Sequence, residues 1–584
     1  MSMLQNVRHM TRSQVLAAVL AGAMIIIVAR LFYLQVIQHD HYVALATEEQ
    51  VKQLVIPASR GLIYAKDGET PVPLAMNQQV YTLFVDPMVV DNPTKVESTV
   101  REVAGGNLIV DDIQKVLRDG REQKSMYRVL ARNVTLRQAE MIKEQRLKGV
   151  GFQQISKRVY PEGDMAAQVL GFVNNEGKGQ YGVEEQLNDR LIGQDGLLKS
   201  VTDVANVPLS IGRDNIRSEP QNGENIVLTI DRNIQSKTQE ALLTGIQKSG
   251  ATHGSALVVD PNTGKVLAMA DYPTYSPAEF TQVTDEQMFR SVATTVPYEP
   301  GSVLKTFTVA TGIDRGVIDA NSTFYNTDSI RVEDRTITNA LKGITGTVTM
   351  QSALNNSLNT GMVTIAQKLG GSDRITKDAR DILYDYFHNK LGLGERTGIE
   401  IAHEQKGVLI SPNDVQGNAV RYSNVAFGQG LDVTMMQVVA GFSAIINGGT
   451  YYPPTVVDGV YKDGSYTQEP VANARKQVIT PSASSQAREM TYQARNGYTS
   501  TDLPGYYVGG KTGTSQTLKD GQYVSTQTIG TYLGFGGTDE ETKYVIMVQV
   551  SGENMNLEGN KHAMPIFTDI SNWLLGYYQL QPRI

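Results

Sequence analysis

The apolar positions begin with one long run near the N-terminus. Residues Val15 to Ile37 are apolar except for Arg30 and Gln35. At about 1.5 Å per residue, a helix of this length spans the roughly 30 Å hydrocarbon core of a membrane. A cleaved signal peptide would have a shorter apolar region followed by a small-x-small site, whereas here the pattern continues through Leu31 to Ile37. We therefore expect an uncleaved transmembrane anchor over residues 15–37.

The charges around this segment predict its orientation. Basic residues precede it and acidic residues follow it: Arg8, Arg12, Asp40, Glu48 and Glu49. The positive-inside rule then places residues 1–14 in the cytoplasm and the rest of the chain outside the plasma membrane, as a single-pass protein. Arg30 either reaches to the membrane surface or contacts a membrane helix of a partner.

Residues 38–220 show a mixed, turn-rich pattern. Strands are expected at Gln50–Pro57, continuing past a turn through residues 59–64, and at Val80–Val85. Residues 92–147 carry helical spacing and many charges. This segment contains no metal-ligand spacing and no phosphate loop, so we interpret it as a non-catalytic, extended α+β domain.

A polar stretch over residues 212–225 predicts a domain boundary near residue 220. The remaining segment, 221–584, begins with a strand over 225–231 and a helix over 234–243, and a hairpin pairs 255–260 with 266–270. Residues 303–450 are expected to be mostly helical. The last elements are strands near 506–508, 529–535 and 544–550 and a helix over 566–577. Strands at both ends of a helical middle predict an α/β (α+β) domain with an antiparallel sheet.

Composition excludes several classes of protein. The net charge of −7 and pI near 5.7 argue against a nucleic-acid-binding protein. The absence of cysteine excludes disulfides and thiolate chemistry. None of the seven histidines lies in an H-E-x-x-H or Ser-His-Asp setting, so no metal and no cofactor is expected.

One short stretch offers candidate chemistry, namely Tyr298 to Lys305. Pro300 and Gly301 interrupt the chain, and the apolar residues from Val303 onward read as the start of a buried helix. Ser302 and Lys305 stand at i and i+3, so they share a face at the positive end of that helix. A hydroxyl with an amine in reach is a candidate activated nucleophile.

Two later stretches complete the pattern. Ser357 and Asn359 stand at i and i+2, so a loop or helix end must present both side chains. Lys511, Thr512, Gly513 and Thr514 follow an expected strand, where Lys511 and Gly513 would face one way and the threonines the other. Residues 505–512 also fit G-x-x-x-x-G-K-T, but no helical run follows, which argues against a phosphate-binding loop.

The three motifs S-x-x-K, S-x-N and K-T-G in this order form a specific signature. With them, nearly the whole chain resembles class B penicillin-binding proteins, the membrane-anchored, monofunctional peptidoglycan D,D-transpeptidases. The similar segments lie at residues 30–35, 60–63, 158–163, 182–184, 228–231, 427–430 and 446–449. One departure is the run Tyr64 to Gly68, where the family usually has an acidic-basic-Asn-Gly sequence; it affects the predicted pedestal domain and leaves the active site unchanged.

The resemblance implies a catalytic set. Ser302 would attack the penultimate D-Ala carbonyl of a stem peptide, and β-lactams would acylate the same residue. Lys305 would accept the proton, with its pKa lowered by burial and by Lys511. Ser357 and Lys511 would pass a proton to the leaving D-Ala.

It also implies a substrate-binding set. Asn359 would bind the substrate amide, and Thr512, Thr514 and Lys511 would hold the terminal carboxylate. Gly513 would let the substrate backbone approach closely. The backbone N–H groups of Ser302 and Thr514 would form the oxyanion hole.

Several alternatives stay open at this point. A β-lactamase or β-lactam sensor and a D,D-carboxypeptidase share the motifs, and an inactive cell-wall scaffold is a further alternative. The family resemblance also implies partners, namely a multi-spanning glycan polymerase and other membrane proteins of the cell-wall complex. The sequence does not distinguish septal division from side-wall elongation.

Overall fold

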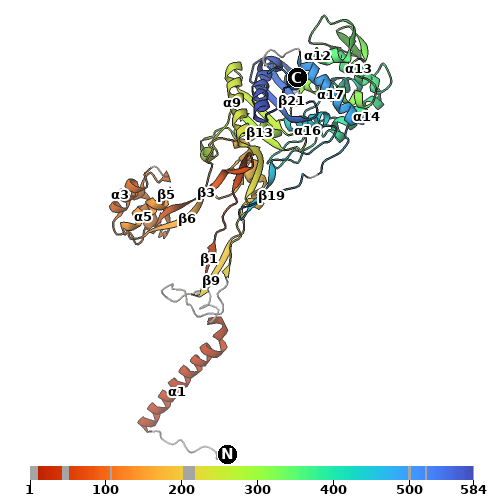
Figure 1. Cartoon of the computed structure of the whole chain (residues 1–584). Helices are drawn as coiled ribbons and strands as arrows, with labels where there is room; N and C mark the ends of the chain where they lie inside the picture. Colours follow the sequence, from red (N-terminus) through yellow and green to blue (C-terminus); the bar gives the residue numbers. More distant parts are fainter. Residues whose placement is uncertain are drawn as a thin grey trace, which may run out of the picture. The chain divides into compact units, whose positions relative to one another are not determined.

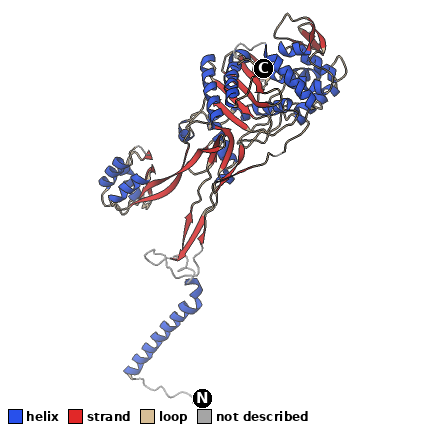
Figure 2. Cartoon of the chain, in the orientation of Figure 1, coloured by secondary structure: helices blue, strands red, loops and turns tan. Residues whose placement is uncertain are grey.

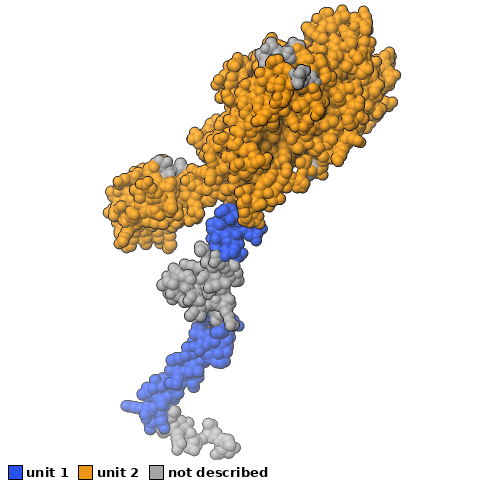
Figure 3. Space-filling model, in the orientation of Figure 1, with its two compact units in different colours: residues 1–59, 193–222 blue, residues 60–192, 223–584 orange. Residues whose placement is uncertain are grey.

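The computed structural model describes residues 11–42, 51–105, 108–201, 217–471, 473–496, 502–519 and 522–582 (Figure 1). The chain divides into two compact units (Figure 3). One comprises residues 1–59 and 193–222, and the other comprises residues 60–192 and 223–584. The predicted domain boundary at residue 220 stays a prediction.

The first unit contains the N-terminal helix. Helix α1 (Arg12–Phe32) continues as one π-helical turn, η1 (Tyr33–Ile37). Within the described residues this is the one helix long and apolar enough to cross a membrane, as the sequence predicts. The same unit holds a three-stranded antiparallel sheet of β1 (Val51–Ile56), β9 (Gly196–Val201) and β10 (Arg217–Ser218), which confirms the strand expected near residues 50–57.

The second unit contains an eight-stranded sheet whose strands come from distant parts of the chain. Its order is β19-β18-β11-β2-β3-β5-β4, and β6 also pairs with β3. Strand β11 lies parallel to β2 and antiparallel to β18. The bounds are β2 Ile63–Asp67, β3 Thr70–Val85, β4 Leu108–Ile109, β5 Arg128–Val134, β6 Val150–Val159, β11 Ile226–Asp231, β18 Val457–Lys462 and β19 Ser465–Gln468.

Strands β3 and β6 run together into a small helical cluster (Figure 1). Helices α3 (Pro93–Val103), α4 (Ile113–Glu122) and α5 (Leu136–Glu144) share an apolar core with the ends of these strands. The helical spacing of residues 92–147 predicts these helices correctly. It misses strand β5, whose residues include Arg128, Arg132 and Asn133 and therefore lack a clear apolar alternation.

A buried ionic triad of Arg60, Arg158 and Glu184 joins three segments of the second unit. Glu184 is fully buried and accepts hydrogen bonds from Arg60 Nε at 2.8 Å and from Arg158 Nε at 2.7 Å. Arg158 also donates to the carbonyl of Gly61 at 2.8 Å. These arginines lie in two of the segments that resemble the family, and Glu184 lies in a third. Their role in this structure is to join sequence segments that are far apart.

The second unit also contains a separate five-stranded antiparallel sheet, whose strand order is β13-β12-β22-β21-β20. The strands are β12 His253–Val259, β13 Val266–Tyr272, β20 Tyr507–Lys519, β21 Gln522–Gly537 and β22 Thr542–Ser551. Successive buried residues of β12 and β22 belong alternately to two apolar clusters, one on each face. The sequence therefore predicts the hairpin and the C-terminal strands correctly.

Helices cover both faces of this sheet (Figure 2). One face packs against α9 (Arg232–Ser249) and α18 (Met564–Tyr577). The other packs against helices that include α16 (Met435–Ile446) and α17 (Pro481–Asn496). Helix α16 is buried along its whole length, which fits its almost entirely apolar sequence.

The middle segment, 303–450, is mostly helical as expected. Besides α16, its helices include α11 Lys305–Asp314, α12 Met350–Asn355, α13 Asn359–Leu369, α14 Lys377–Tyr384 and α15 Ala419–Val425. Two small sheets in this segment are not predicted from the sequence. One pairs β14 (Thr323–Asn326) with β17 (Gly346–Thr349), and the other pairs β15 (Ser329–Val332) with β16 (Arg335–Thr338). These four-residue strands are too short to give a periodic signal.

Candidate active site

Ser302 lies in a short 3₁₀ helix, η4 (Gly301–Leu304), that leads directly into α11. In a 3₁₀ helix residues i and i+3 eclipse one another, so Ser302 and Lys305 project from the same side. Gly301 has a φ of +63°, which a side chain would strain, and its N–H donates to the carbonyl of Gly428 at 2.9 Å. Ser302 is partly exposed, whereas Val303, Leu304 and Lys305 are buried. The expected helix start is confirmed.

The amino group of Lys305 is enclosed by three oxygen acceptors. Its Nζ donates to the Ser357 carbonyl at 2.6 Å, to Ser357 Oγ at 3.0 Å and to Asn359 Oδ1 at 2.7 Å. The side chain is 1% exposed. Burial, followed by the positive charge of Lys511, lowers the pKa of Lys305 well below its usual value. This is the direction that the sequence analysis predicts.

A break between two helices presents Ser357 and Asn359 together. Helix α12 ends with hydrogen bonds from Ser357 N to the Leu354 carbonyl and from Leu358 N to the Ala353 carbonyl. Ser357 has a φ of +54°, in the left-handed region, which costs roughly 1–2 kcal/mol for a residue with a side chain. Asn359 then begins α13, and its Nδ2 donates to the Thr338 carbonyl at 2.9 Å. The helix-end arrangement expected for this pair is confirmed.

Strand β20 brings the third motif to the same place, because it packs against η4. Lys511 and Gly513 are buried, Thr512 is half-buried and Thr514 is exposed, which is the predicted alternation. A Cβ at Gly513 would lie 2.8 Å from the Pro300 carbonyl oxygen. The close approach that Gly513 permits in this structure is therefore to the Ser302 loop.

Lys511 is the second buried amine of the cluster. It is 4% exposed, and burial lowers its pKa to about 8. Its Nζ donates to the carbonyl of Thr512 at 3.2 Å and to Thr512 Oγ1 at 3.3 Å. Thr514 Oγ1 accepts the N–H of Gly559 at 3.2 Å. Two buried amines near one hydroxyl form a site that can move protons and attract a carboxylate.

Glu299 and Tyr523 belong to none of the three motifs, and no sequence pattern predicts a role for them. The Glu299 carboxylate accepts the N–H of Gly430 at 2.7 Å, and Tyr523 donates its hydroxyl to both carboxylate oxygens at 3.0 and 3.1 Å. Residues 427–430 resemble a segment of the family, but their sequence does not predict a contact with Glu299. A glutamate next to Pro-Gly gives no sequence signal for burial, so these contacts become visible only in three dimensions.

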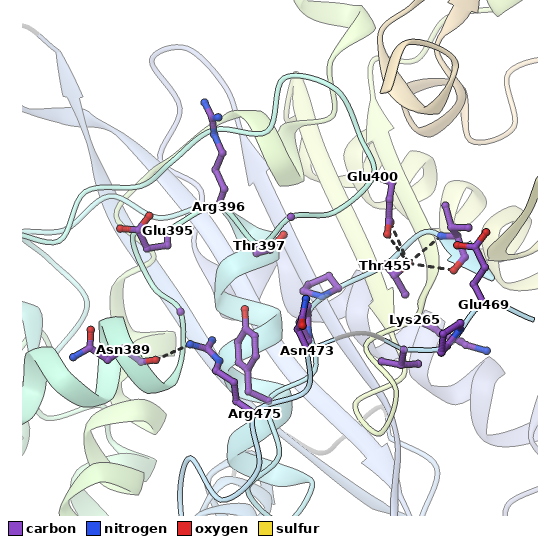
Figure 4. Close-up of a pocket in the computed structure, with 18 of the residues that line it drawn as sticks. Lys265, Asn389, Glu395, Arg396, Thr397, Glu400, Thr455, Glu469, Asn473 and Arg475 are labelled. Atoms are coloured by element: carbon purple, nitrogen blue, oxygen red, sulfur yellow. Dashed lines mark hydrogen bonds between the residues drawn. The ribbon is translucent and has the colours of Figure 1, made fainter. Parts of the chain in front are cut away.

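A separate cavity of about 750 Å³ lies elsewhere in the second unit (Figure 4). It is lined by Lys265 and by parts of residues 388–400, 451–457 and 469–475, and no motif residue contributes to it. Its charged side chains are mostly engaged with other groups. Lys265 pairs with Asp458 at 2.5 Å, Glu395 with Lys406 at 2.8 Å, and Arg475 donates to the Asn389 carbonyl at 2.6 Å. The candidate chemistry therefore belongs to the Ser302 cluster.

Comparisons with known proteins agree with this arrangement. Residues 254–572 match the penicillin-binding protein transpeptidase domain, and residues 55–228 match the penicillin-binding protein dimerisation domain. The chain is 29% identical to stage V sporulation protein D of Bacillus subtilis over 588 residues, covering 98% of this chain and 87% of that protein. It is also 29% identical to penicillin-binding protein PbpB of Mycobacterium tuberculosis, covering 97% of this chain and 84% of that protein.

Solved structures share the fold. A peptidoglycan synthetase from Bifidobacterium adolescentis superposes with a TM-score of 0.70 at 24% identity, covering 91% of this chain and 98% of that one. Penicillin-binding protein 3 of Mycobacterium tuberculosis, in complex with aztreonam, gives a TM-score of 0.67 at 24% identity with the same coverage. With both domain families matched and the three motifs assembled around one serine, the chain belongs to the class B penicillin-binding proteins.

Proposed function

We propose that this protein cross-links peptidoglycan as a serine D,D-transpeptidase and that Ser302 is its nucleophile. Ser302 Oγ attacks the carbonyl of the penultimate D-Ala of a stem peptide, and the terminal D-Ala leaves as the free amino acid. An amine of a neighbouring stem then attacks the acyl-enzyme and restores the serine hydroxyl. The observation that carries this proposal is the buried Lys305 amine, with its lowered pKa, one turn from Ser302.

Lys305 acts as the base for Ser302 in this mechanism. A neutral amine has two protons and one lone pair, and the Lys305 amine faces three oxygens. The Ser357 carbonyl and Asn359 Oδ1 can only accept, whereas the Ser357 hydroxyl can also donate. Ser357 is therefore the group that can return a proton, and with Lys511 it passes one to the departing amine.

The remaining motif residues bind substrate. Asn359 Oδ1 has a second lone pair available for a substrate amide. Lys511 and the hydroxyls of Thr512 and Thr514 attract the terminal carboxylate, while Gly513 keeps the strand close to the Ser302 loop. The backbone N–H groups of Ser302 and Thr514 stabilise the oxyanion, a contribution of roughly 2.7–4 kcal/mol per donor.

Labelling by a fluorescent penicillin tests the nucleophile. The full chain in detergent should be labelled, and the Ser302→Ala variant should not. An unlabelled but folded wild type would exclude the enzyme. Release of D-Ala without cross-linked product would instead identify a carboxypeptidase, and rapid turnover of the penicillin would identify a β-lactamase.

We propose that α1 anchors the protein with its N-terminus in the cytoplasm, so that residues 38–220 form the non-catalytic pedestal and residues 221–584 the transpeptidase domain outside. The basic residues before the helix and the acidic residues after it support this orientation. The chain has no cysteine, which makes single introduced cysteines specific probes. A membrane-impermeant maleimide should label His39→Cys in intact cells and Ser13→Cys only after permeabilisation.

The partners proposed from the family are a multi-spanning glycan polymerase and other membrane proteins of the cell-wall complex. The anchor and the pedestal are the parts of the chain that would contact them. Cross-linking in the membrane followed by identification of the captured proteins tests this. Localisation of a tagged copy at midcell or along the side wall would distinguish division from elongation.

A further inference from the structure

Glu299 is a buried carboxylate beside the nucleophile loop that the mechanism above does not use. It is 6% exposed, and burial raises its pKa. Within the described part of the chain it forms no salt bridge. Its partners are neutral, namely the Gly430 N–H and the Tyr523 hydroxyl. Arg421 lies near enough to favour the charged form of Glu299 and Asp432 near enough to oppose it, but neither side chain bonds to the carboxylate. Burying a carboxylate without a bonded cation is costly, so these contacts need a structural or functional reason.

The contacts of Glu299 fasten two loops together. Tyr298 exchanges backbone hydrogen bonds with Val433, at 3.1 and 3.0 Å. Gly301 N donates to the Gly428 carbonyl at 2.9 Å. Between these two backbone contacts in the sequence, the Glu299 carboxylate accepts a hydrogen bond from the N–H of Gly430. The residues immediately before Ser302 are therefore held along residues 428–433 at three successive points.

The same carboxylate also reaches the hairpin that carries the K-T-G motif. Tyr523 lies near the start of β21, in register with Leu518 of β20. Further along this ladder, Thr514 of β20 lies opposite Gly530. One carboxylate thus contacts the glycine loop that braces Ser302 and the hairpin that presents Lys511 to Thr514.

We propose that Glu299 is a positioning residue for acylation, which holds the Ser302 loop in register with residues 428–430 and with the β20–β21 hairpin. This inference rests on the proposed function. Glu299 affects the chemical step, because its contacts set where the Oγ and the backbone N–H of Ser302 lie relative to the carbonyl of a bound substrate. A misplacement of about 1 Å at such a site can cost on the order of a hundredfold in rate.

The experiment separates binding from chemistry with a fluorescent penicillin and the full chain in detergent. Acylation rates over a range of penicillin concentrations give the dissociation constant of the non-covalent complex and the first-order rate of acylation. Glu299→Ala should lower the acylation rate by about 10- to 100-fold, with a change of less than about threefold in the dissociation constant. Tyr523→Phe should lower the rate by a few fold.

Glu299→Gln is the rescuing variant. Its amide oxygen can accept the Gly430 N–H and its NH₂ can donate to the Tyr523 oxygen, so both contacts are kept. It should acylate within about threefold of the wild type. Glu404→Ala is the matched control, since Glu404 is also buried and accepts the N–H groups of Thr397 at 2.7 Å and Gly398 at 3.0 Å, neither of which belongs to the three motifs. It should lose thermal stability and keep its acylation rate.

The proposal is overturned if folded Glu299→Ala acylates at the wild-type rate, or if Glu299→Gln is as slow as Glu299→Ala. It is also overturned if Glu404→Ala slows acylation equally. Should Glu299→Ala fail to fold, Tyr523→Phe decides, because that tyrosine is 46% exposed and the substitution removes only its hydroxyl, which leaves the core intact. Labelling of the wild type, absent in Ser302→Ala, is measured separately, so failure of this inference differs from failure of the proposed function.

Discussion

Lys305 Nζ lies 2.7 Å from Asn359 Oδ1, although 54 residues separate them in the sequence. The bond joins the start of α11 to the start of α13, and it fixes an amine that water does not reach. Because the asparagine is neutral, it orients the amine without adding a charge that would restore its ordinary pKa. The charge at position 359 therefore controls how much of the Lys305 amine is neutral at a given pH.

Asn359→Asp tests this relationship. A carboxylate beside Nζ favours the protonated amine, so the pKa of Lys305 rises and less free base is present at neutral pH. The acidic limb of the acylation–pH profile should move to higher pH, with a loss of about tenfold or more near pH 7. Asn418→Asp is the control, because this residue caps α15 far from Ser302 in sequence and an aspartate keeps the cap. Superimposable profiles for the two variants would contradict the role of Asn359.

Lys511 should limit the reaction at high pH. Its pKa of about 8 means that its positive charge, which attracts the substrate carboxylate, is lost as the pH rises through that value. Wild-type acylation should fall above about pH 8, and Lys511→Arg should remove this fall because guanidinium stays charged. Lys511→Met should move the acidic limb of the profile to higher pH, since the charge of Lys511 lowers the pKa of Lys305 and is lost in this variant.

A basic limb that persists in Lys511→Arg would assign it to another group. The rate of acylation by the same penicillin is measured as a function of pH for the wild type, Lys511→Arg and Lys511→Met. Circular dichroism of each variant confirms that it is folded. Lys511→Arg and Lys511→Met both keep a long side chain in the buried position. A packing defect would therefore affect both variants, whereas the effects of charge differ between them.

Gly428 should tolerate no side chain. Its φ is +90°, and a Cβ would lie 1.9 Å from the Gly301 carbonyl oxygen. Gly316→Ala is the control, with a φ of +67° and open space around the added atom. The control should lose roughly 1–2 kcal/mol of unfolding free energy and keep acylation. Gly428→Ala should lose more stability and should also acylate more slowly, because the clash displaces the Ser302 loop. Denaturant titrations and acylation assays measure both effects, and equal effects of the two variants would refute this prediction.

Asp271 should make stability depend on pH. Its carboxyl is buried and accepts a hydrogen bond from Val292 N at 3.1 Å. Burial raises its pKa from 3.8 to about 6, against the opposing effect of the Ser255 and Ser291 hydroxyls and the Val292 N–H. A raised carboxyl pKa favours the folded state below pH 4, and that contribution is lost as the pH rises to about 6. The loss is on the order of 3 kcal/mol.

Asp271→Asn lacks this titration, so the melting temperature of the variant relative to the wild type should increase between pH 4 and 6.5 and then stay constant. Thermal melts of both proteins across this range give the measurement. A pH-independent difference would show that the pKa of Asp271 is the same in the folded and unfolded states, and would contradict the raised value.

Much of the fold follows from local pattern. The strands of the five-stranded sheet alternate or are continuously apolar, and α1 and α16 are almost entirely apolar, so sequence reasoning finds them. The small sheets within 323–349 are missed because each strand has only four residues, and strand β5 is missed because its residues lack a clear apolar alternation. The same distinction holds at the site, where S-x-x-K, S-x-N and K-T-G are visible as spacing. Glu299 and Tyr523 meet only because of the tertiary fold, and nothing in either local sequence predicts that contact.

The order of strands in the long sheet has a consequence for biosynthesis. Lys66 of β2 pairs with Asp458 of β18 at 3.1 Å, across 392 residues, and β11 needs β18 to cover its second edge. At about 5–20 residues per second, a ribosome needs roughly 20–80 s to make the chain between these partners. Strand β11 has a free edge from its own synthesis until β18 follows about 226 residues later, which takes roughly 11–45 s at the same rate, and during that time it can pair with other chains. Export and chaperone binding must therefore protect this strand until the C-terminal third has been made.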